Sequence, residues 1–216
     1  TATEAKDKSS HKPEKNPLRL VREMSPALKR LLVADILVRF CEQIPYAFVI
    51  VWSMKIIHAP VTAVQFGILT GIEMTTAMLI YIPVAYFADR SAKKPFIVIT
   101  FGFFTLFPLC LTFATSFEFL VLAFILRGLK EFGEPTRKAL IMDLAPEGRK
   151  AAMFGLYSLI RDVIVSLAAF GGAFLWLISP RVNFMAAVAF GIIGTLSFAL
   201  SGHSFGEGDS GMRNTE

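Results

Sequence analysis

The sequence predicts an all-α integral membrane protein with six transmembrane helices. Hydrophobic residues make up 54% of its 216 residues and charged residues only 18%, whereas soluble domains carry about 25% charged residues. The apolar residues stand in blocks of roughly 20 residues, which is the length that crosses the hydrocarbon core of a bilayer. These blocks show neither the polar face of a soluble helix nor the strict alternation of a barrel strand.

Short connections join the apolar blocks and define the domain organisation. We expect the transmembrane helices at about residues 31–54, 62–88, 95–115, 118–144, 150–178 and 182–201. Together they form a six-helix transmembrane bundle at residues 31–201. Residues 1–30 are expected to be a basic cytoplasmic linker with a short amphipathic helix between Pro17 and Pro26. Residues 202–216 are rich in Gly and Ser and are expected to be a disordered cytoplasmic tail.

Basic residues gather in every second connection and predict the orientation of the bundle. The N-terminal segment, the second connection and the fourth connection are basic, whereas the other three hold at most one basic residue each. Because cytoplasmic loops are enriched in Lys and Arg, we expect both termini in the cytoplasm. The short loops suit a prokaryotic inner membrane. The net charge of +5 does not predict nucleic-acid binding, because no basic, aromatic-interleaved fold follows the basic N-terminal segment.

Ionisable residues inside the predicted spans are candidates for a substrate or proton pathway. A charge within the bilayer is costly, so such residues normally face protein or a water-filled cavity. The candidates are Arg39, Glu42, Glu73, Arg127, Glu131, Glu134, Arg161 and Asp162. A desolvated acid can carry a proton, and an arginine can anchor an anionic substrate. The alternative is that these charges pair between helices and only fix the packing.

Helical spacing predicts how these residues are grouped. Asp35, Arg39 and Glu42 are four and three positions apart, so they share one face of the first helix. Pro45 follows one turn later and is expected to kink this helix. Arg161 and Asp162 are adjacent and point about 100 degrees apart, so we expect each to pair with a different helix. One face of the fourth helix is predicted to hold Arg127, Glu131 and Glu134.

Two pairs of small residues predict close contact between helices. Gly67 and Gly71 stand four positions apart in the second predicted span, and Gly171 and Gly172 are adjacent in the fifth. Small side chains allow helix backbones in a membrane to approach one another. We therefore expect both pairs to pack against neighbouring helices.

Motifs for catalysis or cofactor binding are missing from the sequence. It has no H-E-x-x-H metal motif, no G-x-S-x-G nucleophile motif and no Walker phosphate loop. The three histidines, His11, His58 and His203, lie outside the predicted spans. We therefore expect no enzyme activity, no metal ion and no cofactor.

The connection after the second predicted span resembles the loop signature of the major facilitator superfamily. That signature reads G-x-L-A-D-R-x-G-R-K, and residues 85–94 read AYFADRSAKK. Asp89, Arg90, Lys93 and Lys94 match it, whereas alanine replaces both glycines, as is frequent in the second half of members. The resemblance implies that these four residues form a cytoplasmic gate, in which the acid meets the positive end of a neighbouring helix. The alternative is that the basic residues only set the topology.

The region of the fourth and fifth predicted spans is similar to the same superfamily. Arg127-Gly128 is followed by Pro135, by the run Ala139-Leu140-Ile141, by a Pro and Arg loop, and by a glycine-containing helix. Leu167-Ala168 stand where proton antiporters have Gly-Pro, so the drug/proton antiporter pattern is incomplete.

The resemblance implies a secondary active transporter that moves a small-molecule substrate by alternating access, with a proton as a candidate coupling ion. It covers one six-helix half, so it implies a second half in the same polypeptide, a separate chain or a homodimer. The start at Thr1 and the degenerate loop motif favour the C-terminal half or a half-sized protein. The alternative is a non-transporting membrane scaffold or assembly subunit, in which the charges pair internally and leave no cavity.

Overall fold

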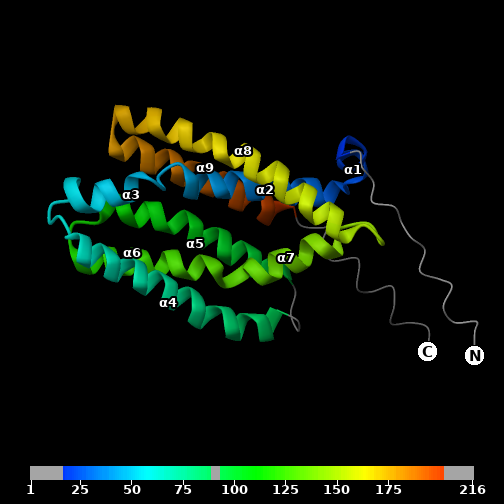
Figure 1. Cartoon of the computed structure of the whole chain (residues 1–216), viewed down its shortest axis with the longest axis horizontal. Helices are drawn as coiled ribbons and strands as arrows, with labels where there is room; N and C mark the ends of the chain where they lie inside the picture. Colours follow the sequence, from blue (N-terminus) through cyan, green and yellow to red (C-terminus); the bar gives the residue numbers. More distant parts are fainter. Residues whose placement is uncertain (1–16, 89–92, 202–216) are drawn as a thin grey trace, which may run out of the picture.

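A computed structural model describes residues 17–88 and 93–201, in which every regular element is a helix (Figure 1). The elements in chain order are α1 (Pro17–Glu23), α2 (Pro26–Gln43), α3 (Phe48–Val51), the π-helix η1 (Trp52–Ile56), α4 (Ala63–Ala88), α5 (Lys93–Phe113), α6 (Phe117–Leu129), the 3-10 helix η2 (Lys130–Gly133), α7 (Glu134–Asp143), α8 (Lys150–Ile178) and α9 (Pro180–Leu200). The expected disordered tail, most of the expected linker, and Asp89 and Arg90 of the expected gate lie outside the described residues.

Four of these helices are long and apolar enough to cross a membrane. They are α4 through Tyr81, α5, α8 and α9, with mean hydropathies between 1.4 and 2.2. The all-helical class and the membrane-length helices agree with the sequence prediction. The first and fourth predicted spans are instead divided into shorter helices, so the count of six spans stays a prediction.

The first predicted span is broken where Pro45 interrupts the helix. Proline has no N–H and its ring clashes with the preceding turn, so α2 ends at Gln43 and α3 begins at Phe48. The side chain of Asn183 on α9 stabilises the break. Its amide donates hydrogen bonds to the carbonyls of Ile44 at 3.4 Å and of Gly172 on α8 at 2.8 Å. The expected kink is therefore a complete break that α8 and α9 support.

Helix α2 begins earlier than the sequence prediction, at Pro26. Ser25 caps the helix by accepting a hydrogen bond from the Leu28 N–H at 3.2 Å, and Pro26 stands at the first helical position, where the missing N–H costs little. The expected short helix before the first span is reduced to α1, which ends at Glu23.

The fourth predicted span changes from α6 to the 3-10 helix η2 and then to α7. Pro135 stands in the first turn of α7, which explains why the α-helix restarts there. Gly133 packs so closely on α5 that a Cβ atom would meet Thr100 Oγ1 and, at 2.7 Å, the Phe96 carbonyl oxygen. The helix expected over residues 118–144 is therefore interrupted by one 3-10 turn, while residues 117–143 stay helical throughout.

Helices α5 and α9 lie at the centre of the bundle, and α4 and α8 lie at its edges (Figure 1). α9 packs against α2, α5 and α8, while α4 packs mainly against α6 and η2. In the most apolar stretch of α4 and of α8, only 11% is buried, against 44% in α5 and 39% in α9. Both edge helices therefore present long apolar faces outward.

The expected packing of the small-residue pairs is only partly correct. Among the described residues, a Cβ atom on Gly67, Gly71 or Gly171 would meet nothing within 4 Å, whereas one on Gly172 would collide with the backbone carbonyl of Ile44. Gly172 thus allows α8 to touch the break after α2. Gly67 and Gly71 face away from the rest of the bundle, so the prediction for this pair is wrong within the described chain.

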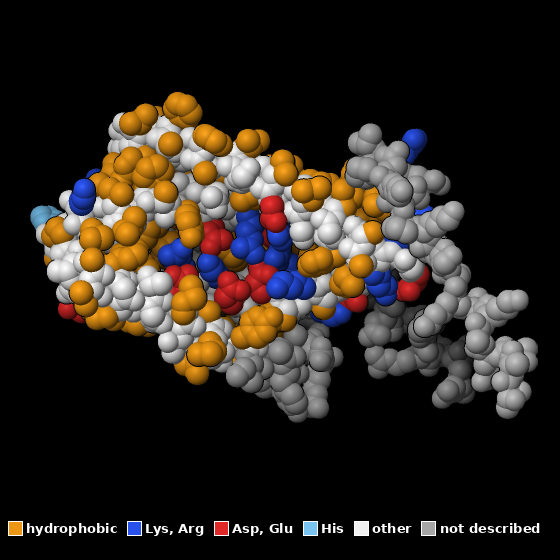
Figure 2. All heavy atoms as spheres, viewed as in Figure 1, with side chains coloured by type: hydrophobic (Ala, Val, Ile, Leu, Met, Phe, Trp, Pro, Cys, Tyr) orange, Lys and Arg blue, Asp and Glu red, His pale blue; other side chains and the backbone are white. Residues whose placement is uncertain are grey.

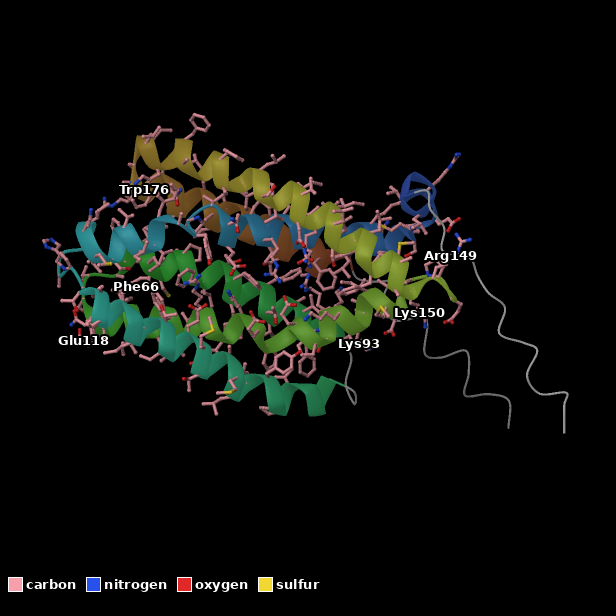
Figure 3. The ribbon with its side chains drawn as sticks, in the orientation of Figure 1. Phe66, Lys93, Glu118, Arg149, Lys150 and Trp176 are labelled. Atoms are coloured by element: carbon pink, nitrogen blue, oxygen red, sulfur yellow. The ribbon has the colours of Figure 1, made fainter. Side chains whose placement is uncertain are left out.

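The basic connections lie at one end of the bundle (Figure 3). Lys93, Arg149 and Lys150 are at this end, and Phe66, Glu118 and Trp176 lie toward the other. Arg149 Nη1 pairs with Glu23 Oε2 of α1 at 2.7 Å, so the N-terminal helix belongs to the same end. The assignment of this end to the cytoplasm rests on the charge pattern and stays a prediction.

Candidate functional site

Charged side chains gather at the middle of one face of the bundle, between α4 and α8 (Figure 2). Hydrophobic side chains surround them on this face. Two cavities lie among ionisable residues of the bundle, with volumes of about 350 and 410 Å³. Such volumes are in the range of small-molecule pockets.

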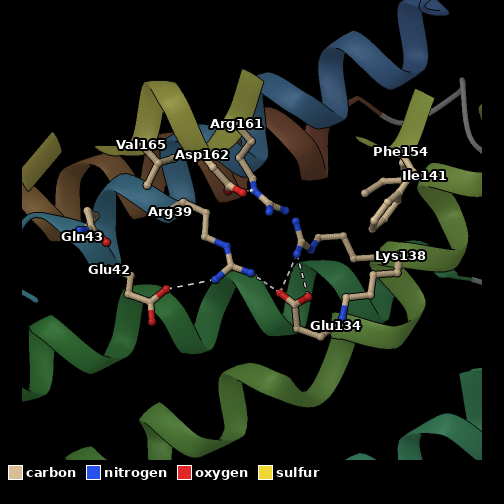
Figure 4. Close-up of a pocket in the computed structure, with 11 residues that line it drawn as sticks. Arg39, Glu42, Gln43, Glu134, Lys138, Ile141, Phe154, Arg161, Asp162 and Val165 are labelled. Carbon is tan, nitrogen blue, oxygen red and sulfur yellow. Dashed lines mark hydrogen bonds and ion pairs between the residues drawn. The ribbon is translucent and has the colours of Figure 1, made fainter. Parts of the chain in front are cut away.

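The first cavity, which we name the arginine cavity, lies between α2, α7 and α8 (Figure 4). Its ionisable lining residues are Arg39, Glu42, Glu134, Arg137, Lys138, Arg161 and Asp162. Arg39 of α2 stands between two carboxylates, donating from Nη1 to Glu42 Oε2 at 3.2 Å and from Nη2 to Glu134 Oε1. It therefore ties α2 to α7 along the wall of the cavity.

Asp35 holds the ion pairs beside this cavity together. Its Oδ2 accepts hydrogen bonds from Arg137 Nη1 and from the Tyr157 hydroxyl at 3.0 Å. Arg161 Nη1 lies 3.6 Å from the same oxygen, and Arg39 Nε lies 3.9 Å from Oδ1. The Asp35 side chain is only 1% exposed. One buried carboxylate therefore contacts three arginines from α2, α7 and α8, which it shares with Glu42, Glu134 and Asp162.

Glu134 and Lys138 complete the charge pattern of the arginine cavity. Arg137 Nη2 donates to both carboxylate oxygens of Glu134, at 2.8 and 2.7 Å, so this acid is shared with Arg39. Lys138 lines the cavity without a hydrogen bond or ion pair to another described residue, although its charge also acts on Glu134. An unpaired ammonium group beside a polar cavity attracts an anionic group.

The second cavity, which we name the methionine cavity, lies between α4 and the α6–η2 segment. It is lined by Glu73, Met74, Ala77, Met78, Tyr81, Arg127, Gly128, Lys130 and Glu131. Glu73 Oε2 lies 3.2 Å from Arg127 Nη1, and Glu73 Oε1 lies 3.8 Å from Lys130 Nζ. Lys130 Nζ also donates to Glu42, and this pair connects the two cavities. Most of the lining surface is apolar.

All eight residues predicted for the substrate or proton pathway line one of the two cavities. Five line the arginine cavity: Arg39, Glu42, Glu134, Arg161 and Asp162. Three line the methionine cavity: Glu73, Arg127 and Glu131. Their placement is a structural finding, and their part in transport stays a prediction.

Two of the predicted groupings are wrong. Glu134 does not share a face with Arg127 and Glu131, because the 3-10 helix η2 changes the helical register between them. Arg161 and Asp162 do not pair with separate helices, since Arg161 Nε donates to Asp162 Oδ1 at 2.8 Å. Of the two, only Arg161 reaches another of the described helices, at Asp35 of α2.

Several residues of the site were not among the predicted candidates. They are Asp35, Lys130, Arg137, Lys138 and Tyr157. The charged ones stand within the predicted spans, so charge at depth was the signal that could have found them. Tyr157 carries no such signal. No group of His, Cys, Asp or Glu in the described part of the chain could hold a metal ion.

The end of α5 carries the two described residues of the expected gate. Lys93 Nζ donates to the Asp143 carboxylate at the end of α7, and Lys94 Nζ donates to the Ala199 carbonyl of α9 at 2.8 Å. These bonds tie three helix ends together at the basic end of the bundle. That they open and close during function stays a prediction.

Replacing Asp143 with asparagine is expected to change the free energy of unfolding by less than about 1 kcal/mol, because exposed ion pairs are screened by water. The Lys93 and Asp143 side chains are 33% and 54% exposed. Chemical unfolding in detergent at low and at about 1 M salt measures the change, which should vanish at high salt. Glu147→Gln, which removes the exposed pair with Lys150, is the matched control. A loss that persists in high salt contradicts this expectation.

Membrane-length helices around a charged, hollowed face define a multi-pass membrane protein of the transporter type. A family model described as Major Facilitator Superfamily matches residues 31–208, and the chain belongs to this superfamily. The match confirms the resemblance seen in the loop signature, and the chain fits a half-domain of the family. Members are in general transporters and not enzymes. A search of curated proteins found no match.

Proposed function

We propose that the protein is one six-helix half of a secondary active transporter, which moves a small solute by alternating access between two bundles. The observation that carries the proposal is the pair of cavities with ionisable linings beside helices of membrane length. In this arrangement α2–η1 and α6–α7 are the first and fourth spans. Residues 31–201 form the transmembrane domain, with both termini in the cytoplasm of a prokaryotic cell.

The exposed faces of the edge helices α4 and α8 favour the presence of a second bundle. α4 and α8 flank the charged face and expose large apolar side chains, among them Leu79 at 67% and Phe170 at 70%. Gly67 and Gly71 leave open space along α4, where another helix can approach closely. A second bundle laid across this face encloses the cavities between two halves. It comes from the same polypeptide, a separate chain or a second copy.

The ion pairs also bear on the scaffold alternative. Most charges within the bundle pair with one another, as a scaffold requires, and Asp35 with its arginines is the clearest case. A scaffold does not account for the two cavities, nor for Glu131 and Lys138, which line them without an ion pair to any described residue. Transport uses both features, because a solute needs space and free polar groups at the same depth.

Solute movement in sealed vesicles tests the proposal. Vesicles containing the native assembly receive a labelled sugar, amino acid, dicarboxylate or organic cation under an imposed proton or sodium gradient. We expect movement of at least one probe and a loss of about tenfold or more, equal to about 1.4 kcal/mol, with Arg161→Ala or Glu131→Gln.

Matched surface variants control for unspecific effects. Arg181→Ala and Glu118→Gln alter exposed residues at helix starts away from both cavities and should leave movement unchanged. Absence of movement under every gradient contradicts the transport proposal. Equal movement in the native protein and both cavity variants contradicts the assigned site.

A further inference from the structure

We propose that the methionine cavity binds an amphipathic organic cation, with Glu131 holding its positive charge and the apolar lining holding its hydrophobic part. This inference rests on the proposed transport function and names the substrate class. The cavity between α4 and η2 has a volume of about 410 Å³, which suits a small organic molecule.

The two basic residues of the cavity already have partners. Arg127 Nη1 lies 3.2 Å from Glu73, and its guanidinium lies 5.2 Å from the centre of the Phe107 ring. Lys130 donates to Glu42. Their charges are therefore offset by two acids that face them, so neither residue draws an anion into this cavity.

Glu131 is the acid of the cavity that lacks a partner. Within residues 17–88 and 93–201 it makes no hydrogen bond or ion pair, and its side chain is half-buried. The more distant attraction of Lys130 and Arg39 is opposed by the repulsion of Glu134 and Glu42. A carboxylate that has lost part of its water and gained no partner is unfavourable at membrane depth. A cation that enters the cavity supplies the missing charge.

The remaining lining matches the hydrophobic part of such a ligand. Met74 and Met78 are flexible and polarisable, so they adapt to ligands of different shape. The Tyr81 ring offers a face that attracts cations. The lining holds few neutral hydrogen-bonding groups of the kind that a sugar requires. The arginine cavity, with its guanidinium groups and free Lys138, has the opposite character.

Equilibrium dialysis of two ions of equal shape and opposite charge tests the proposal. Tetraphenylphosphonium and tetraphenylborate are offered to the native assembly purified in detergent. We expect saturable binding of the cation that is about tenfold or more weaker in Glu131→Gln, because a single charge pair is removed from a poorly hydrated site. Binding of the anion should not depend on Glu131.

Two further variants separate specific binding from detergent-like partitioning. Glu118→Gln removes an exposed acid at the start of α6 and should leave cation binding unchanged. Met78→Ala should weaken cation binding by about threefold or more, because apolar contact is lost. Equal binding of both ions, or cation binding that Glu131→Gln does not change, overturns the proposal.

The outcome is distinct from that of the transport experiment. Binding is measured without a gradient, so a protein that binds the cation yet moves no solute refutes transport alone. A protein that moves another probe and does not bind the cation refutes the substrate class alone.

Discussion

Replacing Asp35 with asparagine is expected to lower the free energy of unfolding by about 3–5 kcal/mol, the usual effect of removing one partner from a buried ion pair. Asp35 is 1% exposed and faces Arg137, Arg161 and Arg39. Asparagine keeps the size of the side chain and removes the charge. Three guanidinium groups then share Glu134, Glu42 and Asp162 as their remaining acids.

Urea unfolding in mixed micelles, followed by the fluorescence of Trp52 and Trp176, measures this loss. Asp162→Asn is the matched control, because Asp162 is 65% exposed and pairs with the adjacent Arg161. We expect a loss below about 1 kcal/mol in the control. Equal losses in the two variants contradict the central role of Asp35.

A double-mutant cycle tests whether Asp35 acts through Arg137. If it does, Asp35→Asn combined with Arg137→Gln should be less destabilising than the sum of the single variants, since the second change removes one of the uncompensated charges. Strict additivity means that the two side chains do not interact in the folded protein.

The apolar blocks predicted where helices lie, because a bilayer demands long uninterrupted apolar helices. They could not predict where a helix breaks. Pro45 and Pro135 stand at breaks, whereas Pro83 and Pro108 lie inside continuous helices. A proline deprives the carbonyl four residues earlier of its partner.

At Pro108 a tertiary contact takes the place of the missing backbone hydrogen bond. Pro108 leaves the Phe104 carbonyl without a backbone donor, and the thiol of Cys41 on α2 approaches that oxygen at 3.3 Å. The neighbouring helix thus supplies the lost hydrogen bond, and α5 continues. The donor stands 63 positions away in the sequence, so the residues around Pro108 do not predict it.

The candidate site was predictable as a set of residues but not as a network. Charge at membrane depth selects Arg39, Glu42 and Glu134 correctly, because only a protein interior tolerates such groups. Helical spacing says nothing about partners on other helices. Asp35 stands near the start of the first predicted span, and only the packing of α7 and α8 around it shows its burial.

The sequence pattern also did not predict which glycine makes the close contact between α4 and α6. Gly67 and Gly71 match the small-xxx-small spacing, yet a Cβ atom on either would meet no described residue within 4 Å, whereas Gly128 stands alone and carries the contact. A spacing rule detects glycines that could pack, and the position of the opposing helix determines which of them do.

Replacing Gly128 with valine is therefore expected to destabilise the protein by about 1–3 kcal/mol or more, the usual range for overpacking. A Cβ atom at this position lies 2.6 Å from the Glu73 carbonyl oxygen and 2.7 Å from Thr76 Cβ. The first of these is backbone and cannot rotate away, so α4 and α6 must separate. Separation also pulls Glu73 from Arg127, because the two belong to these helices.

Gly102→Val provides the matched control for this effect, because a Cβ atom at Gly102 of α5 meets no atom of the described chain within 4 Å. Both substitutions replace glycine with the same β-branched residue inside a helix, so their intrinsic helix propensities cancel in the comparison. Urea unfolding in micelles should show a large loss for Gly128→Val and little change for Gly102→Val. Similar midpoints for the two variants would mean that α4 and α6 do not meet at Gly128.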